Sequence, residues 1–395
     1  MNKKINLGTT IFLCILVGVI SFMSAWTITR SEYKLTLNNM KLSYPEAMKL
    51  MEIIDYYDKY YIYSGDEALS ENLAMSGFVS GTGDKYGKYY SEEEYREIIE
   101  DDNGNFVGIG ITVITKEGGV IKVERVIKDS PAEKAGILTG DCIIGVDDVK
   151  IEDSVEALMD AIKGEEGTEV KITVLRDGEK LTLKAIRAKV TTESVFWGYI
   201  EEEKIGFVRI FEFDNTTPTQ FKEALDELKG KGAEKFIFDL RDNGGGLLTS
   251  ITGVLEQLLP KDTLITTSTL KNGSTTEYKT KKEYEEFNYP AAVLVNGYTA
   301  SAAELFTANM RDYDKAVIVG ETTYGKGVMQ STFLLSDGSA LKLTTAYYSA
   351  PNGENYDGKG IEPSVKASIG DGVISYYEVD IEDEVIKAAI NELSK

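Results

Sequence analysis

The sequence predicts an α/β protein with a second, smaller α+β domain, N-terminal helices and one membrane-spanning helix. Three observations support this prediction. Strand, helix and strand patterns alternate over residues 205–349, which is typical of an α/β core. Short alternating strands, with one helix early and one late, occupy residues 105–189 and indicate a separate small domain. A largely apolar segment over residues 5–28 is long enough to span a bilayer.

Composition restricts the partners and the environment of the chain. Its 395 residues suffice for two or three domains, and a hydrophobic content of 42% can fill their cores. The 65 acidic and 43 basic residues give a net charge of −22, so the phosphates of a nucleic acid are repelled and no such partner is expected. Because Cys14 lies in the apolar segment and Cys142 is the only other cysteine, a secreted disulfide scaffold is excluded.

The N-terminal residues carry the signals for location. Lys3 and Lys4 precede the apolar segment, and a basic flank keeps the N-terminus in the cytoplasm and sends the following chain outside. We predict that residues 1–30 are a cytoplasmic N-terminus and an uncleaved transmembrane anchor in a bacterial cell membrane. A cleaved signal peptide is the alternative, but residues 21–25 match the small-x-small cleavage pattern poorly.

Helical patterns occupy residues 31–104, ahead of the small domain. Pro45 can open a first helix, because proline is favoured at the first helical position. One apolar and aromatic stripe follows at helical spacing and comprises Ala47, Leu50, Met51, Ile54, Tyr57 and Tyr61. A second helix is predicted over residues 66–79 and a turn over residues 84–90. The simplest interpretation is a helical support for the domains that follow.

Residues 290–330 are the most informative stretch of the α/β core. A short apolar run over residues 292–295 ends at the turn pair Asn296 and Gly297, and helical spacing begins at Ser301. A serine at this place lies among the free backbone N–H groups of a helix N-terminus. Two interpretations stay open: Ser301 is a nucleophile, or Ser301 and Glu304 form a capping box.

The complete absence of histidine limits the chemistry that a serine nucleophile can use. It removes every Ser-His-Asp, Cys-His and His-ligated metal mechanism. A serine nucleophile would need another base, and a serine-lysine pair is a known variant. Lys326 stands between Gly325 and Gly327, and Gln330 follows four residues later. To accept a proton, a lysine must lower its pKa from near 10.4 to roughly 7 or 8, at a cost of about 3.5–4.5 kcal/mol. Burial can do this, and a neutral amide can orient the amine.

Residues 295–330 closely resemble the catalytic segment of the C-terminal processing peptidases, also called tail-specific proteases. The resemblance implies that Ser301 is the nucleophile, Lys326 the general base and Gln330 the residue that positions the lysine. Residues 238–246 are similar to the DLR-N-GG loop of the same family, except that glycine replaces its usual proline at position 244. This similarity implies an oxyanion hole built from the backbone amides of Gly245 and Ala302.

Two acidic residues of the same stretch align with positions that some relatives use as auxiliaries. We interpret both as structural. Glu304 is expected to be the cap partner of Ser301, and Asp312 is expected to end the helix.

The small domain resembles a PDZ domain of the bacterial protease type in four segments, residues 106–111, 130–137, 140–144 and 170–176. Such domains bind an extended peptide as an added strand and hold its terminal carboxylate with loop N–H groups. The resemblance implies that Gly108, Ile109 and Gly110 supply these groups; alternatively the glycines only shape a strand turn. Arg176 corresponds to an arginine that links peptide occupancy to the catalytic site in relatives. The alternative is a solvated arginine at a hairpin end.

We therefore predict a helical region (31–104), a PDZ domain (105–189) and a crotonase-like catalytic core with a C-terminal helix (190–395). The expected function is that of a membrane-anchored, extracytoplasmic serine endopeptidase that needs no metal or cofactor. Its expected substrates are proteins with exposed, apolar C-terminal tails. Because the resembling family uses its N-terminal helices partly for dimer contacts, a homodimer is expected. Two other classes stay open: a catalytically silent PDZ adaptor, and a crotonase-like enzyme acting on acyl thioesters.

Overall fold

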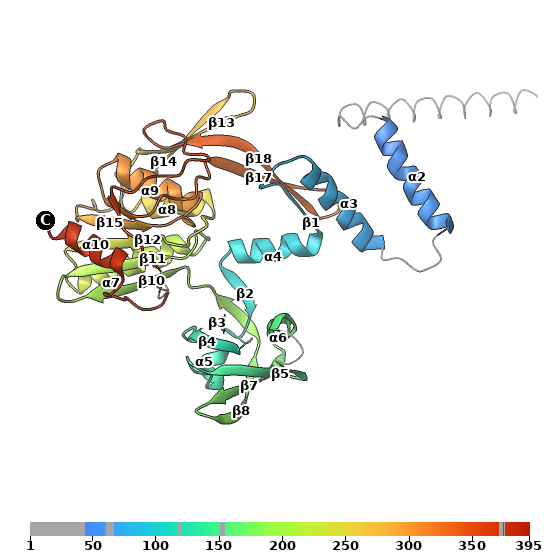
Figure 1. The fold of residues 1–395 in the computed structure, drawn as a ribbon, viewed down its shortest axis with the longest axis horizontal. Helices are drawn as coiled ribbons and strands as arrows, with labels where there is room; N and C mark the ends of the chain where they lie inside the picture. The colour runs from blue at the N-terminus through green and yellow to red at the C-terminus, as the bar shows by residue number, and fades with distance from the viewer. Residues whose placement is uncertain (1–43, 61–66, 117–119, 151–154, 371–373, 375) are drawn as a thin grey trace, which may run out of the picture. The chain divides into compact units, whose positions relative to one another are not determined.

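The computed structural model describes residues 44–60, 67–116, 120–150, 155–370, 374 and 376–395 (Figure 1). The predicted anchor over residues 5–28 lies outside these ranges. None of the helices within them is long and apolar enough to cross a membrane. The chain divides into two compact units, Met1–Glu71 and Asn72–Lys395, and each is described by itself.

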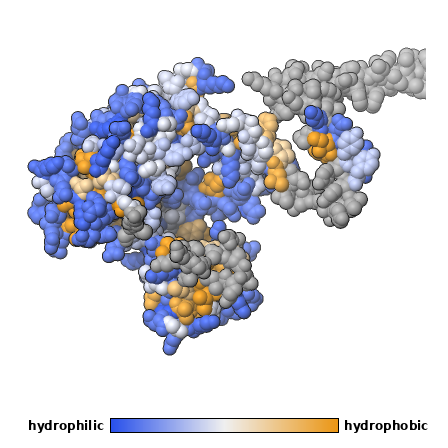
Figure 2. Space-filling view, viewed as in Figure 1, coloured by the Kyte–Doolittle hydropathy of each residue, from blue (hydrophilic) through white to orange (hydrophobic). Residues whose placement is uncertain are grey.

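Two N-terminal helices agree closely with the sequence prediction. They are α2 (Tyr44–Tyr60) and α3 (Glu67–Gly81). Each helix carries apolar side chains that are exposed in the structure, including Met51 and Ile54 on α2 and Leu73 and Phe78 on α3. Figure 2 shows these helices with hydrophobic residues among hydrophilic ones.

The α/β core is built on a sheet with the strand order β10-β11-β12-β15-β16-β19. Only the β10 pairing is antiparallel, and every other neighbouring pair is parallel. The strands are β10 (Val195–Ile200), β11 (Ile205–Ile210), β12 (Lys235–Asp239), β15 (Ala291–Val295), β16 (Val317–Gly320) and β19 (Val365–Lys366). The helices are α7 (Thr217–Gly230), α8 (Leu248–Leu255), α9 (Ala302–Asp312) and α10 (Glu384–Leu393).

Helices cover both faces of this sheet. Alternate strand residues such as Val208 and Phe238 pack with α7, α8 and α9, whereas Phe207 and Ile237 pack with α10. Because both faces are buried, the central strands read as continuous apolar runs rather than as alternating patterns. The parallel strands end at one edge, where the loops that follow β12 and β15 carry residues 240–247 and 296–301.

A second, antiparallel sheet flanks the core and has the order β1-β18-β13-β14, with β17 also paired to β18. Its strands are β1 (Lys88–Tyr90), β13 (Leu264–Leu270), β14 (Thr275–Lys279), β17 (Val328–Leu334) and β18 (Ala340–Ser349). The sequence predicts only a turn over residues 84–90. The structure instead places β1 in this sheet, where Tyr89 pairs with Leu341. A strand of three residues is too short to show an alternating pattern in the sequence, so only its pairing with β18 makes it a strand.

The small domain has its own hydrophobic core and the strand order β3-β4-β5-β7-β8, with β6 paired to β5. Its elements are β3 (Ile111–Lys116), β4 (Val120–Val126), α5 (Pro131–Ala135), β5 (Cys142–Val146), β6 (Val149–Lys150), α6 (Val155–Ile162), β7 (Glu169–Arg176) and β8 (Glu179–Ile186). The chain enters through α4 (Glu92–Asp102) and β2 (Asn105–Gly108), and β2 pairs with β9 (Ala188–Thr191) as the chain leaves.

Candidate active site

A cavity of about 410 Å³ lies at the N-terminus of α9 and collects the residues that the sequence singles out. Its lining includes Ser301, Ala302, Lys326 and Gln330. These residues come from the loop after β15, the first turn of α9, the loop before β17 and β17 itself. Helix α4 closes part of the wall through Tyr95, Ile98 and Asp102. The tertiary fold therefore brings the predicted nucleophile, base and positioning amide to one cavity.

Ser301 has a strained backbone at the entrance to α9. Its φ of 57° and ψ of −117° lie in a region that side-chain-bearing residues rarely adopt. The surrounding hydrogen bonds hold it there: the Ser301 N–H donates to Glu304 at 2.9 Å, and the Ala300 N–H donates to the Asn243 carbonyl at 2.9 Å. Strain of this kind costs about 1–3 kcal/mol and concentrates at functional sites.

Lys326 is half-buried, and burial lowers the pKa of its amine below the ordinary value. The positive charge of Lys342, which also lines the cavity, lowers the pKa of Lys326 further, whereas Glu304 opposes this shift. The Nζ atom lies 4.6 Å from the centre of the Tyr86 ring. The Lys326 amine therefore loses its proton more readily than a lysine amine in water.

The glycines on either side of Lys326 are required by close backbone contacts. A Cβ atom at Gly325 would lie 2.7 Å from the Gly360 nitrogen, and one at Gly327 would lie 2.7 Å from the Asp357 nitrogen. The loop of residues 325–327 therefore packs directly on residues 357–360, which fixes the position of the Lys326 backbone.

Ser301, Lys326 and Gln330 line the same cavity, but their side chains are not hydrogen-bonded to one another in this structure. Across the described ranges, no hydrogen bond joins Lys326 Nζ to Ser301 Oγ or to Gln330. Gln330 Nε2 instead lies 3.4 Å from both the Val328 carbonyl oxygen and Thr344 Oγ1. The Lys326 amine instead lies over the Tyr86 ring.

The predicted oxyanion residues are immediate neighbours. Gly245 has a φ of 109°, and a Cβ atom there would lie 2.7 Å from Ser301 Cβ and 2.9 Å from the Ala302 nitrogen. Only glycine fits at this contact. The Gly245 N–H donates to Asn243 Oδ1 at 2.8 Å, so this amide is already occupied. Binding an oxyanion through Gly245 would require exchanging that internal bond for the ligand.

Glu304 has a larger role than the local cap predicted for it. Its buried carboxylate accepts four hydrogen bonds, from Ser301 N at 2.9 Å, Thr323 Oγ1 at 2.6 Å, Gly325 N at 2.7 Å and Lys326 N at 2.8 Å. One side chain thus ties the serine turn to the lysine loop. Burial raises the pKa of Glu304, while these bonds oppose the rise. The sequence signal that could have indicated this role is an acidic residue facing the apolar side of α9.

Asp312 ends α9, as the sequence predicts, and does not line the cavity. Its carboxylate contacts Arg311 at 2.8 Å and accepts from the Asn352 N–H at 3.2 Å. These contacts join the end of the helix to the loop after β18, which is a structural role.

The predicted peptide-binding residues join β2 to β3 in the small domain. The Ile109 carbonyl accepts from the Ala132 N–H at 2.7 Å, and the Gly110 carbonyl accepts from the Ile127 N–H at 3.0 Å. A Cβ atom at Gly110 would lie 2.4 Å from Ser130 Cβ. Ile109 and Gly110 are thus packed against the start of α5, and the close approach of Ser130 explains the glycine at position 110.

Arg176 forms an ion pair inside the small domain. Its guanidinium contacts both carboxylate oxygens of Asp141 at 2.7 Å and donates to the Gly136 carbonyl at 2.8 Å. Burial alone would raise the pKa of Asp141, but hydrogen bonds from Arg176 and Leu138 lower it. A switch role for Arg176 stays a prediction, and it would require this bidentate pair to open.

A strained serine and a half-buried lysine in one cavity, beside a separate small β domain, are compatible with a serine-type peptidase. The PDZ domain model matches residues 107–186, and the model named peptidase family S41 matches residues 204–367. The chain belongs to peptidase family S41, as a serine-type C-terminal processing peptidase.

Curated relatives and solved structures are similar to the chain, including the following three. A probable CtpA-like serine protease of Staphylococcus haemolyticus (strain JCSC1435) is 33% identical over 376 residues, which cover 92% of this chain and 74% of the relative. The carboxy-terminal processing protease CtpA of Bacillus subtilis (strain 168) is 35% identical over 329 residues, covering 82% and 69%. The photosystem II D1 C-terminal processing protease, 24% identical, has a TM-score of 0.50 over 87% of this chain and 92% of that chain, which supports the fold.

Replacing Glu304 by glutamine is expected to lower kcat by about 10- to 100-fold, because small displacements of reacting groups are costly. In the wild type, the Gly325 and Lys326 N–H groups donate to the two carboxylate oxygens of Glu304. In the variant, the NH2 group of the new amide replaces one of these acceptors and faces a donor. Losing hydrogen bonds to a charged acceptor should also lower the free energy of unfolding by about 2–3 kcal/mol. Peptide hydrolysis and urea unfolding measure both effects. Asp312→Asn, at the other end of α9, is the matched control and should keep wild-type kcat.

Replacing Lys342 by methionine is expected to move the ascending limb of the kcat/KM profile to higher pH. The neutral amine is the active form of a lysine base, so with Lys326 as the predicted base, activity is expected to rise with pH through its pKa. Removing a nearby positive charge favours the ammonium and raises that pKa. Lys271→Met, at an exposed position outside the cavity lining, is the control and should leave the profile unchanged. An unchanged profile for Lys342→Met would contradict the assignment of the limb to Lys326.

Proposed function

We propose that the protein is a membrane-anchored, extracytoplasmic serine endopeptidase in which Ser301 and Lys326 form a catalytic dyad. The observation that carries this proposal is the shared cavity of a strained Ser301 and a Lys326 whose pKa is lowered by burial. Because the chain has no histidine, this lysine is the base best placed to accept the serine proton.

The proposed reaction runs in two steps through an acyl-enzyme. Neutral Lys326 swings from the Tyr86 ring, oriented by Gln330, and accepts the Ser301 hydroxyl proton as Oγ attacks the scissile carbonyl. The Ala302 amide stabilises the developing oxyanion, and the Gly245 amide joins it by exchanging its bond to Asn243 Oδ1 for the oxyanion. Each donor contributes roughly 3–4 kcal/mol. Lys326 then delivers the proton to the leaving amine, activates a water molecule and releases the new C-terminus.

Substrate selection is proposed to use the cavity and the PDZ domain together. The cavity wall contains the apolar side chains Ile98, Leu248, Ile251 and Leu305, which suit an apolar side chain next to the scissile bond. The loop containing Gly108–Gly110 is proposed to bind the C-terminal carboxylate of the substrate. Arg176 is the candidate that signals this occupancy to the core. The substrates are therefore proteins with exposed, apolar C-terminal tails.

Location and assembly complete the proposal. The apolar segment over residues 5–28 is proposed to anchor the protein in the cell membrane, with the catalytic core outside the cytoplasm. The exposed apolar side chains of α2 and α3 support a homodimer, since such side chains are usually covered by a partner.

Hydrolysis by the full-length chain in detergent tests the proposed chemistry against both alternative classes. The substrates are an unfolded protein, two peptides that differ only in a C-terminal carboxylate or amide, and an acyl-coenzyme A thioester. We expect cleavage of the protein, faster cleavage of the peptide with the free carboxylate, and no thioester hydrolysis. Peptide binding without cleavage would indicate a PDZ adaptor. Thioester hydrolysis without protein cleavage would indicate a crotonase-like enzyme acting on thioesters.

A further inference from the structure

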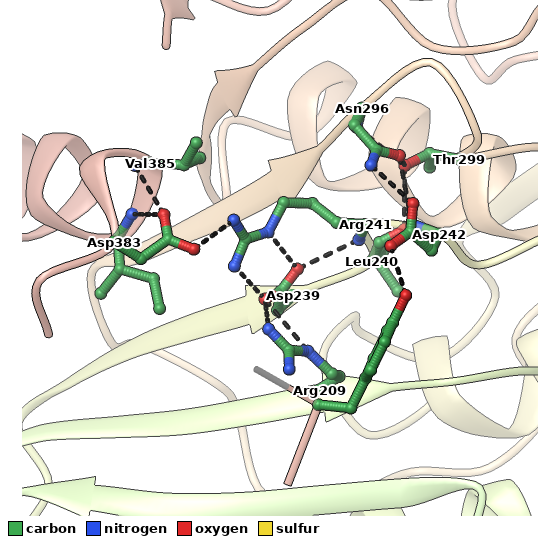
Figure 3. Close-up of polar contacts among 11 residues, drawn as sticks. Arg209, Asp239, Leu240, Arg241, Asp242, Asn296, Thr299, Asp383 and Val385 are labelled. Atoms are coloured by element: carbon green, nitrogen blue, oxygen red, sulfur yellow. Dashed lines mark hydrogen bonds and ion pairs between the residues drawn. The ribbon is translucent and has the colours of Figure 1, made fainter. Parts of the chain in front are cut away.

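The C-terminal part of the chain contacts the loop that carries Gly245 through a buried line of charges. Asp383, the residue before α10, pairs with Arg241 at 2.7 Å. Arg241 also pairs with Asp239 at 2.7 Å, and Asp239 in turn pairs with Arg209. Figure 3 shows Arg241 between the carboxylates of Asp383 and Asp239. The chain of charges thus begins at the C-terminal helix and ends inside the central sheet.

These charges are removed from water, so each depends on its neighbours. The exposed fraction of the side chain is 2% for Arg241 and 7% for Asp383. Burial alone would raise the pKa of Asp239, but Arg209 and Arg241 lower it to about 2. Removing one partner of a buried pair leaves an uncompensated charge, which is strongly unfavourable. Arg241 therefore has little freedom to move while Asp383 is present.

A second contact from the C-terminal part reaches the residue after Arg241. The Tyr376 hydroxyl donates to Asp242 Oδ2 at 2.9 Å. Asp242 also accepts from the Asn296 side-chain amide at 2.8 Å, and its backbone has a φ of 63°. Burial and the carboxylate of Asp242 raise the pKa of Tyr376 to about 12, so the hydroxyl keeps its proton across the working pH range.

The loop residues that follow connect these contacts to the serine. Asn243 donates its side-chain amide to the Ile210 carbonyl at 2.8 Å and accepts the Gly245 N–H through Oδ1. Its own carbonyl accepts the Ala300 N–H at 2.9 Å. Gly245 then packs directly against Ser301. A displacement of residues 241–242 would therefore act on Asn243, whose side chain holds the Gly245 amide and whose carbonyl holds the residue before Ser301.

We propose that Asp383 and Tyr376 are positioning residues for the oxyanion amide of Gly245. Asp383 acts through Arg241, and Tyr376 acts through Asp242. This inference rests on the proposed function, because it assumes that the Gly245 N–H binds the oxyanion. It assigns the C-terminal segment a part in the reaction in addition to its packing against the sheet. The alternative is that both residues only attach α10 to the core.

Two conservative substitutions in the full-length chain separate these roles. Asp383→Asn keeps an acceptor for the Val385 and Ile386 N–H groups, so the helix cap is retained, but it removes the charge that faces Arg241. Tyr376→Phe removes only the hydroxyl. The matched controls are Glu384→Gln, at an exposed carboxylate beside Asp383, and Tyr377→Phe, whose hydroxyl lies 3.4 Å from Thr112 of the small domain.

The measurements are kcat and KM for a peptide substrate and the inhibition constant of a peptide boronate, whose tetrahedral adduct places a hydroxyl in the oxyanion position. We expect Asp383→Asn to lower kcat by about 10- to 100-fold and to weaken boronate inhibition in parallel, with KM within about twofold. Tyr376→Phe should act in the same direction, and both controls should match the wild type. A purely structural role would not couple kcat to boronate affinity in this way.

The positioning role of Asp383 and Tyr376 and the proposed peptidase function fail on different results. Wild-type kcat and boronate affinity in both Asp383→Asn and Tyr376→Phe, with an inactive Ser301→Ala, would overturn the inference alone. Activity in Ser301→Ala and no boronate inhibition of the wild type would overturn the proposed function as well. If Asp383→Asn fails to fold, Tyr376→Phe decides the question, because loss of one hydroxyl leaves the buried charges intact.

Discussion

Replacing Ser301 by alanine is expected to reduce kcat for peptide hydrolysis by roughly 10⁴- to 10⁶-fold, the range found when a serine nucleophile is removed. The substitution removes the hydroxyl that is proposed to attack the scissile carbonyl. Binding of a C-terminal peptide to the small domain should be unaffected, since the substitution leaves that domain intact. Rates with a chromogenic peptide and peptide titration measure the two effects.

A glycine at the same position provides a control that also tests the strain. Both Ser301→Ala and Ser301→Gly lack the hydroxyl and should be equally inactive. Glycine adopts a φ of 57° without the steric cost of a side chain, so its variant should be more stable than the alanine variant by about 1 kcal/mol in urea unfolding. Cleavage by Ser301→Ala at the wild-type rate would exclude Ser301 as the nucleophile.

Replacing Lys326 by alanine is expected to lower kcat by about 10³- to 10⁴-fold, because the general base is lost while substrate binding is retained. The ascending limb of the pH profile should disappear with it. Burial lowers the pKa of this lysine, so in the wild type the limb should lie below the ordinary titration range of a lysine. Rates measured from pH 5 to pH 10 show both effects.

Lys326→Arg distinguishes a base from a positive charge at this position. The guanidinium stays protonated at every working pH and cannot accept the serine proton, although it keeps the charge in the cavity. We therefore expect Lys326→Arg to be as inactive as Lys326→Ala. Substantial activity in the arginine variant would show that the charge, and not proton transfer, is what the site requires.

Much of the fold could be predicted from local sequence patterns. The apolar run before Ser301 is β15, the helical spacing after it is α9, and the predicted tail helix is α10. These elements are strongly periodic or fully apolar, so their neighbours along the chain determine them. β1 was not predictable, because three residues become a strand only when β18 lies beside them.

Part of the candidate site could likewise be predicted from the sequence, and part of it depends on the fold. Ser301 and Lys326 stand out by residue type, because a chain without histidine offers few bases. The carboxylate of Glu304 could be read only as a cap, since two of its partners, Gly325 and Lys326, lie in a loop distant in sequence. The engagement of the Gly245 N–H by Asn243 is likewise a property of the folded loop.

The sequence by itself indicated the class of this protein, its candidate reacting groups and the order of its domains, because residue types and short-range periodicity are local properties. Only the tertiary structure decided how those groups meet. It shows one buried carboxylate joining the serine turn to the lysine loop, and it connects Asp383 at the C-terminal helix to the loop of Gly245. Contacts between residues far apart in the chain depend on packing and on the burial of charge, which no local pattern records.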